Sequence, residues 1–264
     1  MTSWEFAAAG PIAVDIELPA GSVNVTARPA TTVTVELRAS HGAGERLLAE
    51  TEVSFESETL RVHAPKRSSI RGHASLDLDV EVPEGSSVKF ETASADVALD
   101  GQFGPVRGTT ASGDVRVDQV GGDTELTVAS GDVRLEAATE DVRVNSASGD
   151  VAIGQAGGDI IAKTASGDVW VHHAGQSVTA KTASGDIRVD SIAAGLADAT
   201  TVSGDVTLAV VPGTGLYMDI STLSGDVSSD LESDASVGAE GEASLTVSCR
   251  TVSGDIRLLR ATTR

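Results

Sequence analysis

From Ser112 to Ile192 the chain repeats with a period of nine residues and without an insertion. Alternate nonapeptides resemble each other most, so that Ser-Gly-Asp returns every eighteen residues. The fourth and sixth positions of each nonapeptide are apolar in nearly every copy, whereas the fifth is usually polar. This alternation predicts two short, half-buried strands in every eighteen residues. A unit of that size cannot bury its apolar face alone and has to stack on its neighbours.

We therefore predict an all-β fold: a single β-solenoid, similar to a parallel β-helix, with 18-residue coils and two short strands per coil. No window has the i, i+3, i+4 apolar spacing of a helix, so no helix is predicted. We expect one domain over residues 1–264. It would contain irregular opening coils with an N-terminal cap over 1–93, regular coils over 94–211 and longer-looped closing coils over 212–264.

The recurring Ser-Gly-Asp triplet is best explained as a turn. Glycine tolerates positive φ, and a neighbouring Asp or Ser can hydrogen-bond to local backbone groups. A serine nucleophile, by contrast, needs a base and an orienting group at one place. The chain has only five histidines, and the triplet occurs in eight copies, so catalysis is not expected there. The copies begin at Ser112, Ser130, Ser148, Ser166, Ser184, Ser203, Ser224 and Ser253.

Calcium binding is the main alternative for the aspartates of the triplet. The calcium-binding nonapeptide of solenoidal toxins has its Asp at position six, whereas the Asp of this repeat stands at position three, and position six is apolar. We therefore predict no metal site and no cofactor. Stacked aspartates such as Asp168 and Asp186 would repel one another. We expect outward arginines such as Arg134 and Arg188, each followed by an acid, to offset that repulsion.

Two inward columns carry polar or reactive side chains. The alternation predicts that the single cysteine, Cys249, is an inert core thiol, and one cysteine cannot form an internal disulfide. It also predicts an inward ladder of threonine hydroxyl groups near one corner of the coil. Its members are Thr164, Thr182, Thr201, Thr222 and Thr251.

The charge of the chain excludes several classes of partner. A formal net charge of −20, from 39 acidic and 19 basic residues, disfavours nucleic acid and anionic lipid. No stretch approaches the length of a membrane span, so membrane insertion is not expected. Residues 1–21 have no basic segment before an apolar run, and Pro11 interrupts the short apolar run that they contain. We therefore expect no signal peptide and a cytoplasmic location.

One break in the outward columns is a candidate interaction patch. The arginine column changes to Ala152 and then Trp170, while the acidic column changes to Gly154 and then His172. In the simpler interpretation, the indole lies flat over the two small residues and fills an outer groove. In the alternative, the four residues form a contact patch, because exposed aromatic side chains anchor interfaces. His172 and its sequence neighbour His173 point apart on a strand, so they are not expected to share a metal.

Several stretches together resemble a known family. They are the opening "PIAVDIELPAGSVNV", the central "LRVHAPK", the serial "TASGDV" units and the closing "TVSGDIRLLR". This combination is similar to the bacterial "putative adhesin" proteins of β-strand repeats, a domain of unknown function. It looks most like the actinobacterial branch without signal peptides. The resemblance implies a β-solenoid and supplies no established catalytic residue.

These observations predict a non-catalytic scaffold or protein-interaction module of the "putative adhesin" type, which binds an unknown protein partner and is not an enzyme. One alternative is a surface adhesin that is exported. An alternative from another class is a carbohydrate-active β-helix enzyme. The enzyme would need a cleft that is walled by loops and lined by two or more carboxylates.

The ends of a solenoid expose unpaired strands, which invite association with another molecule. Trp4 and Phe6 are expected to cover the N-terminal end. The closing stretch "SGDIRLLRATTR" has little sequence after it, and Arg257, Arg260 and Arg264 place positive charge there. We therefore expect any self-association to be a homodimer through the C-terminal coil, because a symmetric contact closes.

Overall fold

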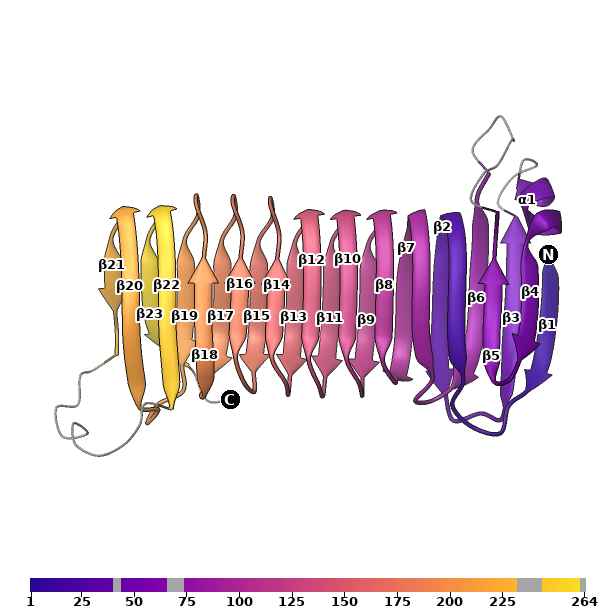
Figure 1. Ribbon diagram of the computed structural model, residues 1–264, viewed down its shortest axis with the longest axis horizontal. Coiled ribbons are helices and arrows are strands. Elements are labelled where there is room, and N and C mark those ends of the chain that lie inside the picture. Colours follow the sequence, from indigo (N-terminus) through magenta and orange to yellow (C-terminus); the bar gives the residue numbers. More distant parts are fainter. Residues whose placement is uncertain (40–43, 66–73, 232–243, 262–264) are drawn as a thin grey trace. The chain divides into compact units, whose positions relative to one another are not determined.

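The computed structural model describes residues 1–39, 44–65, 74–231 and 244–261 of the chain. The fold is an all-β solenoid with one short helix, as predicted apart from the helix (Figure 1). The chain divides into two compact units, Met1–Val133 and Arg134–Arg264. The single domain expected over 1–264 stays a prediction. The acidic stretch 232–243 and Arg264 lie outside the described residues.

In the second unit each coil contributes one strand to each of two parallel faces. One face runs β13, β15, β17, β19, β23, β21, and the other runs β12, β14, β16, β18, β22, β20. The strands, with β11 at the start of the unit, are β11 (Val133–Ala138), β12 (Val142–Ser148), β13 (Val151–Ala156), β14 (Ile160–Lys163), β15 (Val169–Ala174), β16 (Val178–Lys181), β17 (Ile187–Ile192), β18 (Gly195–Thr200), β19 (Val206–Val210), β20 (Leu216–Ser224), β21 (Val227–Ser229), β22 (Leu245–Ser253) and β23 (Ile256–Arg260).

The register confirms the predicted coil. Val151 lies beside Val169, and Val169 lies beside Ile187, so neighbouring residues on a face are eighteen positions apart. The fourth and sixth positions of all nine nonapeptides are buried, from Val115 to Val189. Because each coil presents the same two columns, the core is a continuous narrow layer of Val, Ile, Leu and Ala between the two faces.

From Thr164 onward, the corner of each coil is held by a turn glycine and an inward threonine, as predicted. Gly167 has φ +141°, and a Cβ at this position would lie 2.1 Å from the carbonyl oxygen of Gly149 in the preceding coil. Only glycine fits such a close approach in the left-handed region. Thr182 is buried, and its hydroxyl group donates to the Gly167 carbonyl oxygen at 3.2 Å. The same bond joins Thr201 to Gly185.

The closing coils do not follow the order of the sequence. Strand β23 pairs in parallel with β19 on one side and with β21 on the other, and β22 lies in the same way between β18 and β20. The prediction that the C-terminal coil lies at the open end is therefore wrong. The last coil of this unit is formed by β20 and β21, which come earlier in the chain. The chain therefore leaves the stack after β21 and returns at β22, which lies between β18 and β20.

The first unit mixes parallel coils with antiparallel pairs. The long strands β2 and β7 each form both faces of a coil and pair with each other in parallel, and β8, β9 and β10 continue the stack. Strand β2 also pairs in parallel with β5 and β6. The strands are β1 (Thr2–Ala7), β2 (Ala13–Arg28), β3 (Thr32–Ala39), β4 (Glu52–Glu56), β5 (Thr59–His63), β6 (Leu76–Pro83), β7 (Ser87–Phe103), β8 (Val106–Ser112), β9 (Val115–Val120) and β10 (Thr124–Ser130).

The opening of this unit differs from a simple coil. Strands β1 and β3, β3 and β6, and β4 and β5 pair in antiparallel fashion. Phe6 on β1 stacks on Phe55 of β4, with ring centroids 5.2 Å apart. Helix α1 (Gly44–Glu50) was not predicted, because seven residues are too few to establish a helical period. It buries Leu47.

Candidate functional site

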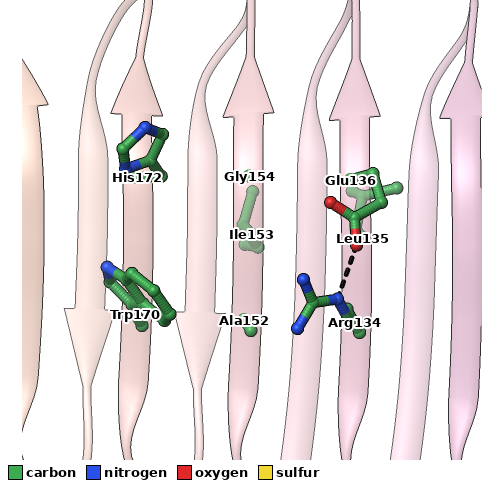
Figure 2. A pocket seen from close by; sticks show the side chains of 8 residues that line it. All are labelled: Arg134, Leu135, Glu136, Ala152, Ile153, Gly154, Trp170 and His172. Atoms are coloured by element: carbon green, nitrogen blue, oxygen red, sulfur yellow. Dashed lines mark hydrogen bonds and ion pairs between the residues drawn. The ribbon is translucent and has the colours of Figure 1, made fainter.

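An open groove lies on the outer face of the second unit, across strands β11, β13 and β15. Trp170 and His172 form one wall, and Ala152 and Gly154 form the floor, as Figure 2 shows. These residues point outward because their neighbours in sequence occupy the buried columns. We call this site the aromatic groove. Its volume is about 270 Å³, and it is lined by Arg134, Leu135, Glu136, Ala152, Ile153, Gly154, Trp170 and His172.

The floor is low for a structural reason. A Cβ on Gly154 would lie 2.2 Å from the carbonyl oxygen of Glu136 on the neighbouring strand β11. Glycine therefore permits the close approach of the two backbones. Ala152 lies beside Trp170 in the register of β13 and β15, so a single methyl group stands next to a large ring. The step from small to large side chains creates the groove.

Trp170 is held on the side away from the floor. Its indole Nε1 donates a hydrogen bond of 2.8 Å to the Oδ2 atom of Asp190 on β17, and β15 lies between β13 and β17. The Arg188 guanidinium lies 6.0 Å from the indole centroid, within the range of a cation–π contact. The ring thus leans toward β17 and remains 46% exposed. It does not fill the space over Ala152 and Gly154.

Asp190 organises the charges behind the indole. Besides Trp170 it contacts His172 Nδ1 at 3.1 Å and accepts a hydrogen bond from Arg188 Nε. Burial alone would raise the pKa of Asp190, but the hydrogen bonds from Arg188, His172 and Trp170 outweigh it, and the pKa lies below its ordinary value. The carboxylate is therefore ionised at neutral pH. It fixes the orientation of the aromatic wall.

The opposite wall is an ion pair along one strand. Arg134 Nε and Glu136 Oε1 are paired on β11, in the arrangement that the outward acid and base columns predict (Figure 2). Arg188 and Asp190 form the same pair on β17. Each of these two pairs joins one cation to one anion, although the whole chain carries a formal charge of −20.

The structure brings together all four residues of the predicted patch, Trp170, His172, Ala152 and Gly154. That the patch binds a partner stays a prediction. Sequence reasoning did not single out Asp190 as the anchor of the indole, although it lies in the same outward column as His172, eighteen positions later. The eighteen-residue period from His172 is the signal in the sequence that points to Asp190.

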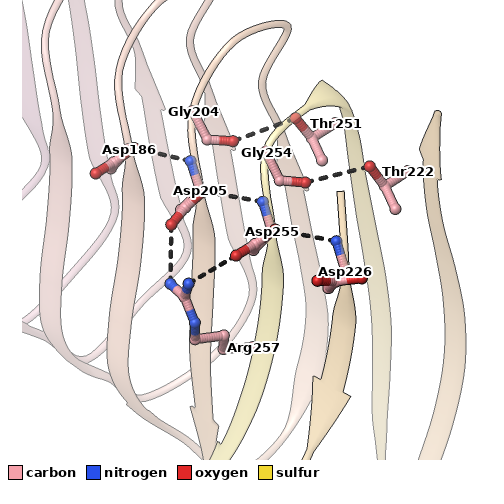
Figure 3. A network of polar contacts seen from close by, with 9 residues as sticks. All are labelled: Asp186, Gly204, Asp205, Thr222, Asp226, Thr251, Gly254, Asp255 and Arg257. Carbon is pink, nitrogen blue, oxygen red and sulfur yellow. Dashed lines mark hydrogen bonds and ion pairs between the residues drawn. The ribbon is translucent and has the colours of Figure 1, made fainter. Parts of the chain in front are cut away.

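The aspartates of the Ser-Gly-Asp turns form a ladder of hydrogen bonds. The backbone N–H of Asp186 donates to Oδ1 of Asp168 at 2.8 Å, and the N–H of Asp205 donates to Asp186 in the same way. Figure 3 shows the ladder continuing through Asp255 to Asp226. In this ladder the carboxylates of Asp168, Asp186, Asp205 and Asp255 each accept a hydrogen bond from a backbone N–H of the neighbouring coil. This contact, which the sequence analysis did not foresee, offsets repulsion within the column.

Arginine adds to this ladder near the last coils. Arg257 donates to Asp205 and Asp255, each at 2.8 Å (Figure 3). The hydrogen bond from the Asp255 backbone, followed by that from Arg257, lowers the pKa of Asp205.

Within residues 1–39, 44–65, 74–231 and 244–261, no group of three or more His, Cys, Asp or Glu side chains is placed to hold a metal ion. The described helix is also not long and apolar enough to cross a membrane.

Comparison with known proteins gives one family and several structural neighbours. The family model described as Toastrack DUF4097 matches residues 13–259. No curated protein matches the sequence significantly. A crystal structure of a "putative adhesin" from Bacteroides fragilis is 13% identical, with 98% of this chain and 96% of that chain covered and a TM-score of 0.49.

Two further solved structures have the same coverage, 98% of this chain and 96% of theirs. A "putative adhesin" from Parabacteroides merdae is 11% identical and has a TM-score of 0.49. A "putative lipid binding protein" from Parabacteroides distasonis is also 11% identical and has a TM-score of 0.48.

Proposed function

The chain belongs to the Toastrack DUF4097 family, and from this premise we propose that it is a non-catalytic scaffold that binds a protein partner through the aromatic groove. The observation that carries the proposal is the open space beside Trp170, in a face that is otherwise a regular array of charged columns. Exposed tryptophans with fixed orientation are frequent anchors of protein interfaces.

The open shape of the groove favours a side chain of a protein over a small molecule. Small-molecule ligands are usually buried over most of their surface in a cleft or cavity, whereas the aromatic groove is open on the outer face. The floor of Ala152 and Gly154 beside the indole suits an apolar or aromatic side chain.

The chemistry of the reactive groups supports a non-catalytic role. Burial, with a smaller contribution from Asp198, raises the pKa of the Cys249 thiol to about 12, so the thiol is protonated and inert at neutral pH. The aromatic groove contains one carboxylate, Glu136, which is paired with Arg134. A glycoside hydrolase of the usual kind needs two carboxylates on opposite sides of the bond that is cleaved.

The test compares two tryptophan variants. Trp170→Ala removes the wall of the groove, whereas Trp4→Ala removes the other tryptophan of the chain. A partner recovered from native lysate with the wild-type protein and with Trp4→Ala, but lost with Trp170→Ala, would support the proposal. A partner retained equally by both variants would contradict it.

A direct measurement uses the NMR signal of the Trp170 indole alone. In a Trp4→Phe background, Trp170 is the only tryptophan. Binding of N-acetyl-tryptophanamide or N-acetyl-phenylalaninamide can then be followed by chemical-shift changes of the Trp170 indole N–H. We expect saturable changes with these aromatic probes and none with N-acetyl-alaninamide. Identical responses to all three probes would show that the groove does not select aromatic side chains.

The cytoplasmic location and the exported-adhesin alternative stay predictions. Fractionation of the source bacterium separates them: recovery of the protein from the cell surface would support the adhesin, and recovery only with cytosolic markers would exclude it.

A further inference from the structure

The last coil of the second unit, formed by β20 and β21, has an unfinished core. Among the described strands, β20 pairs only with β22, and β21 pairs only with β23. Met218 continues the inward column of Val247, but Val247 is fully buried and Met218 is 46% exposed. Val227 continues the column of Ile256 and is 51% exposed. Among the described residues, no further coil covers these side chains.

The outward side of β20 is apolar as well. Tyr217 is 61% exposed and Leu223 is 84% exposed, which makes Leu223 the most exposed large apolar side chain among the described residues. The charged columns that cover the outer faces of inner coils are nearly absent here. Asp219 is the only charged residue in β20 and β21, and Arg250 neutralises it at 2.8 Å.

We propose that this coil docks on the same coil of a second copy, with β20 pairing in antiparallel fashion with its symmetry mate about a twofold axis at Ile220. A free strand edge is satisfied by another strand. The end of an identical solenoid also has the same width between its two faces. A twofold contact closes on itself, so it completes both cores and leaves no further free end at that contact.

The sequence of β20 is self-complementary in this register. Residues that face each other across an antiparallel pair lie on the same side of the sheet, so inward residues must oppose inward residues. With Ile220 opposite its own copy, Met218 opposes Thr222 on the inner side. On the outer side Tyr217 opposes Leu223, an aromatic–aliphatic pair that stabilises sheets, and Asp219 opposes Ser221.

The neighbouring registers are worse. A shift that places Asp219 on the twofold axis sets two like charges directly opposite each other, which is destabilising. A shift that places Ser221 on the axis moves Tyr217 opposite the turn residue Gly225, beyond the end of the strand. Only the register about Ile220 combines a neutral centre with the pairing of Tyr217 and Leu223.

Charge also selects this surface. A chain with a formal net charge of −20 repels its own copies over most of its surface. The strands β20 and β21 carry a single charged residue, Asp219, and several of the most exposed apolar side chains of the described residues. Self-association is therefore placed at β20 and β21, and not at the C-terminal strand β23, both edges of which are already paired.

The decisive experiment changes Ser221, which faces outward and lies opposite Asp219 of the second copy. Ser221→Lys creates two symmetric ion pairs across the interface, and Ser221→Asp creates two like-charge pairs. From the usual strength of cross-strand charge pairs, we expect the dimer Kd to fall roughly two- to thirtyfold for Lys and to rise for Asp. Thr200 occupies the same column on the inner strand β18, so Thr200→Lys and Thr200→Asp are matched controls without an expected effect.

The measurement is sedimentation equilibrium of the full chain over a concentration series. A dimer whose Kd changes in opposite directions for the two Ser221 variants supports the proposal, and Ile220→Lys should abolish that dimer. A monomer at all concentrations overturns it. So does a series of larger oligomers, which would indicate head-to-tail stacking, or a dimer that responds equally to the Ser221 and Thr200 variants. None of these outcomes depends on the aromatic groove.

Discussion

Asp190 accepts a hydrogen bond from the indole of Trp170 at 2.8 Å, although the two residues are twenty positions apart and lie on neighbouring coils. The same carboxylate contacts His172 and Arg188. One residue outside the groove thus fixes the position of its aromatic wall. The effect of Asp190 on the free energy of unfolding can be measured without a binding partner.

The contribution of Asp190 should depend on pH. Its pKa is lower in the folded protein than the ordinary value of 3.8, so the folded state binds fewer protons than the unfolded state near that pH. The stabilisation is therefore complete above the ordinary pKa and is lost as the pH falls through the folded pKa. Asp190→Asn should lower the free energy of unfolding by about 1 kcal/mol or less at pH 7.

Chemical denaturation at several pH values checks this. The difference between wild type and Asp190→Asn should shrink between about pH 5 and pH 2, whereas Thr179→Val, which changes no charge, should follow the wild type throughout. A constant difference at all pH values would contradict the role assigned to Asp190.

A side chain at a turn glycine should destabilise the coil strongly. Gly167→Val places a β-branched residue at φ +141° and a Cβ 2.1 Å from the Gly149 carbonyl oxygen. Backbone strain alone costs about 1–3 kcal/mol, and the overlap adds to it. Thr179→Val, on the outward side of β16, should change stability by less than about 0.5 kcal/mol. Equal melting temperatures for the two variants would refute the register.

Two buried threonines should respond differently to replacement by valine. The Thr182 hydroxyl group donates to Gly167, so Thr182→Val should cost about 1 kcal/mol. Thr124 is also buried, but its hydroxyl oxygen has no hydrogen-bond partner among the described residues. Thr124→Val should be neutral or stabilising, because valine or isoleucine occupies this position in the other eight nonapeptides. Thermal unfolding of both variants provides the comparison, and destabilisation of the same size would contradict it.

Chelation should not affect the fold. The carboxylates of the Ser-Gly-Asp turns accept backbone N–H groups of the next coil, for example Asp168 from Asp186. Calcium needs six to eight oxygen ligands around one point. We expect the melting temperature to be the same with EDTA and with added calcium. A rise of many degrees with calcium would show that the aspartate ladder binds metal.

The sequence predicted the regular coils because their periodicity is local. Every inward position from Val115 to Val189 follows from simple alternation, and so do the turn glycines and the threonines behind them. The outward location of Trp170 follows from the same rule. Its hydrogen bond to Asp190 does not, because alternation specifies which face a side chain is on but not the direction in which it leans.

The order of the coils could not be predicted in this way. All coils present nearly the same columns, so β21 has the same pattern as β23, and nothing in the pattern says which of them pairs with β19. The irregular spacing after Val211 was the only sign that the order changes. Helix α1 and the antiparallel opening pairs likewise depend on contacts between distant segments.

The insertion of β22 and β23 between earlier strands has a consequence for synthesis on the ribosome. The chain emerges from its N-terminus, so β20 and β21 are available before the coil that separates them from β18 and β19. Until residue 260 has been made, the edges of β18 and β19 that β22 and β23 occupy in the finished fold are free. The last step in forming this end of the protein is therefore the entry of a coil between strands that were made before it.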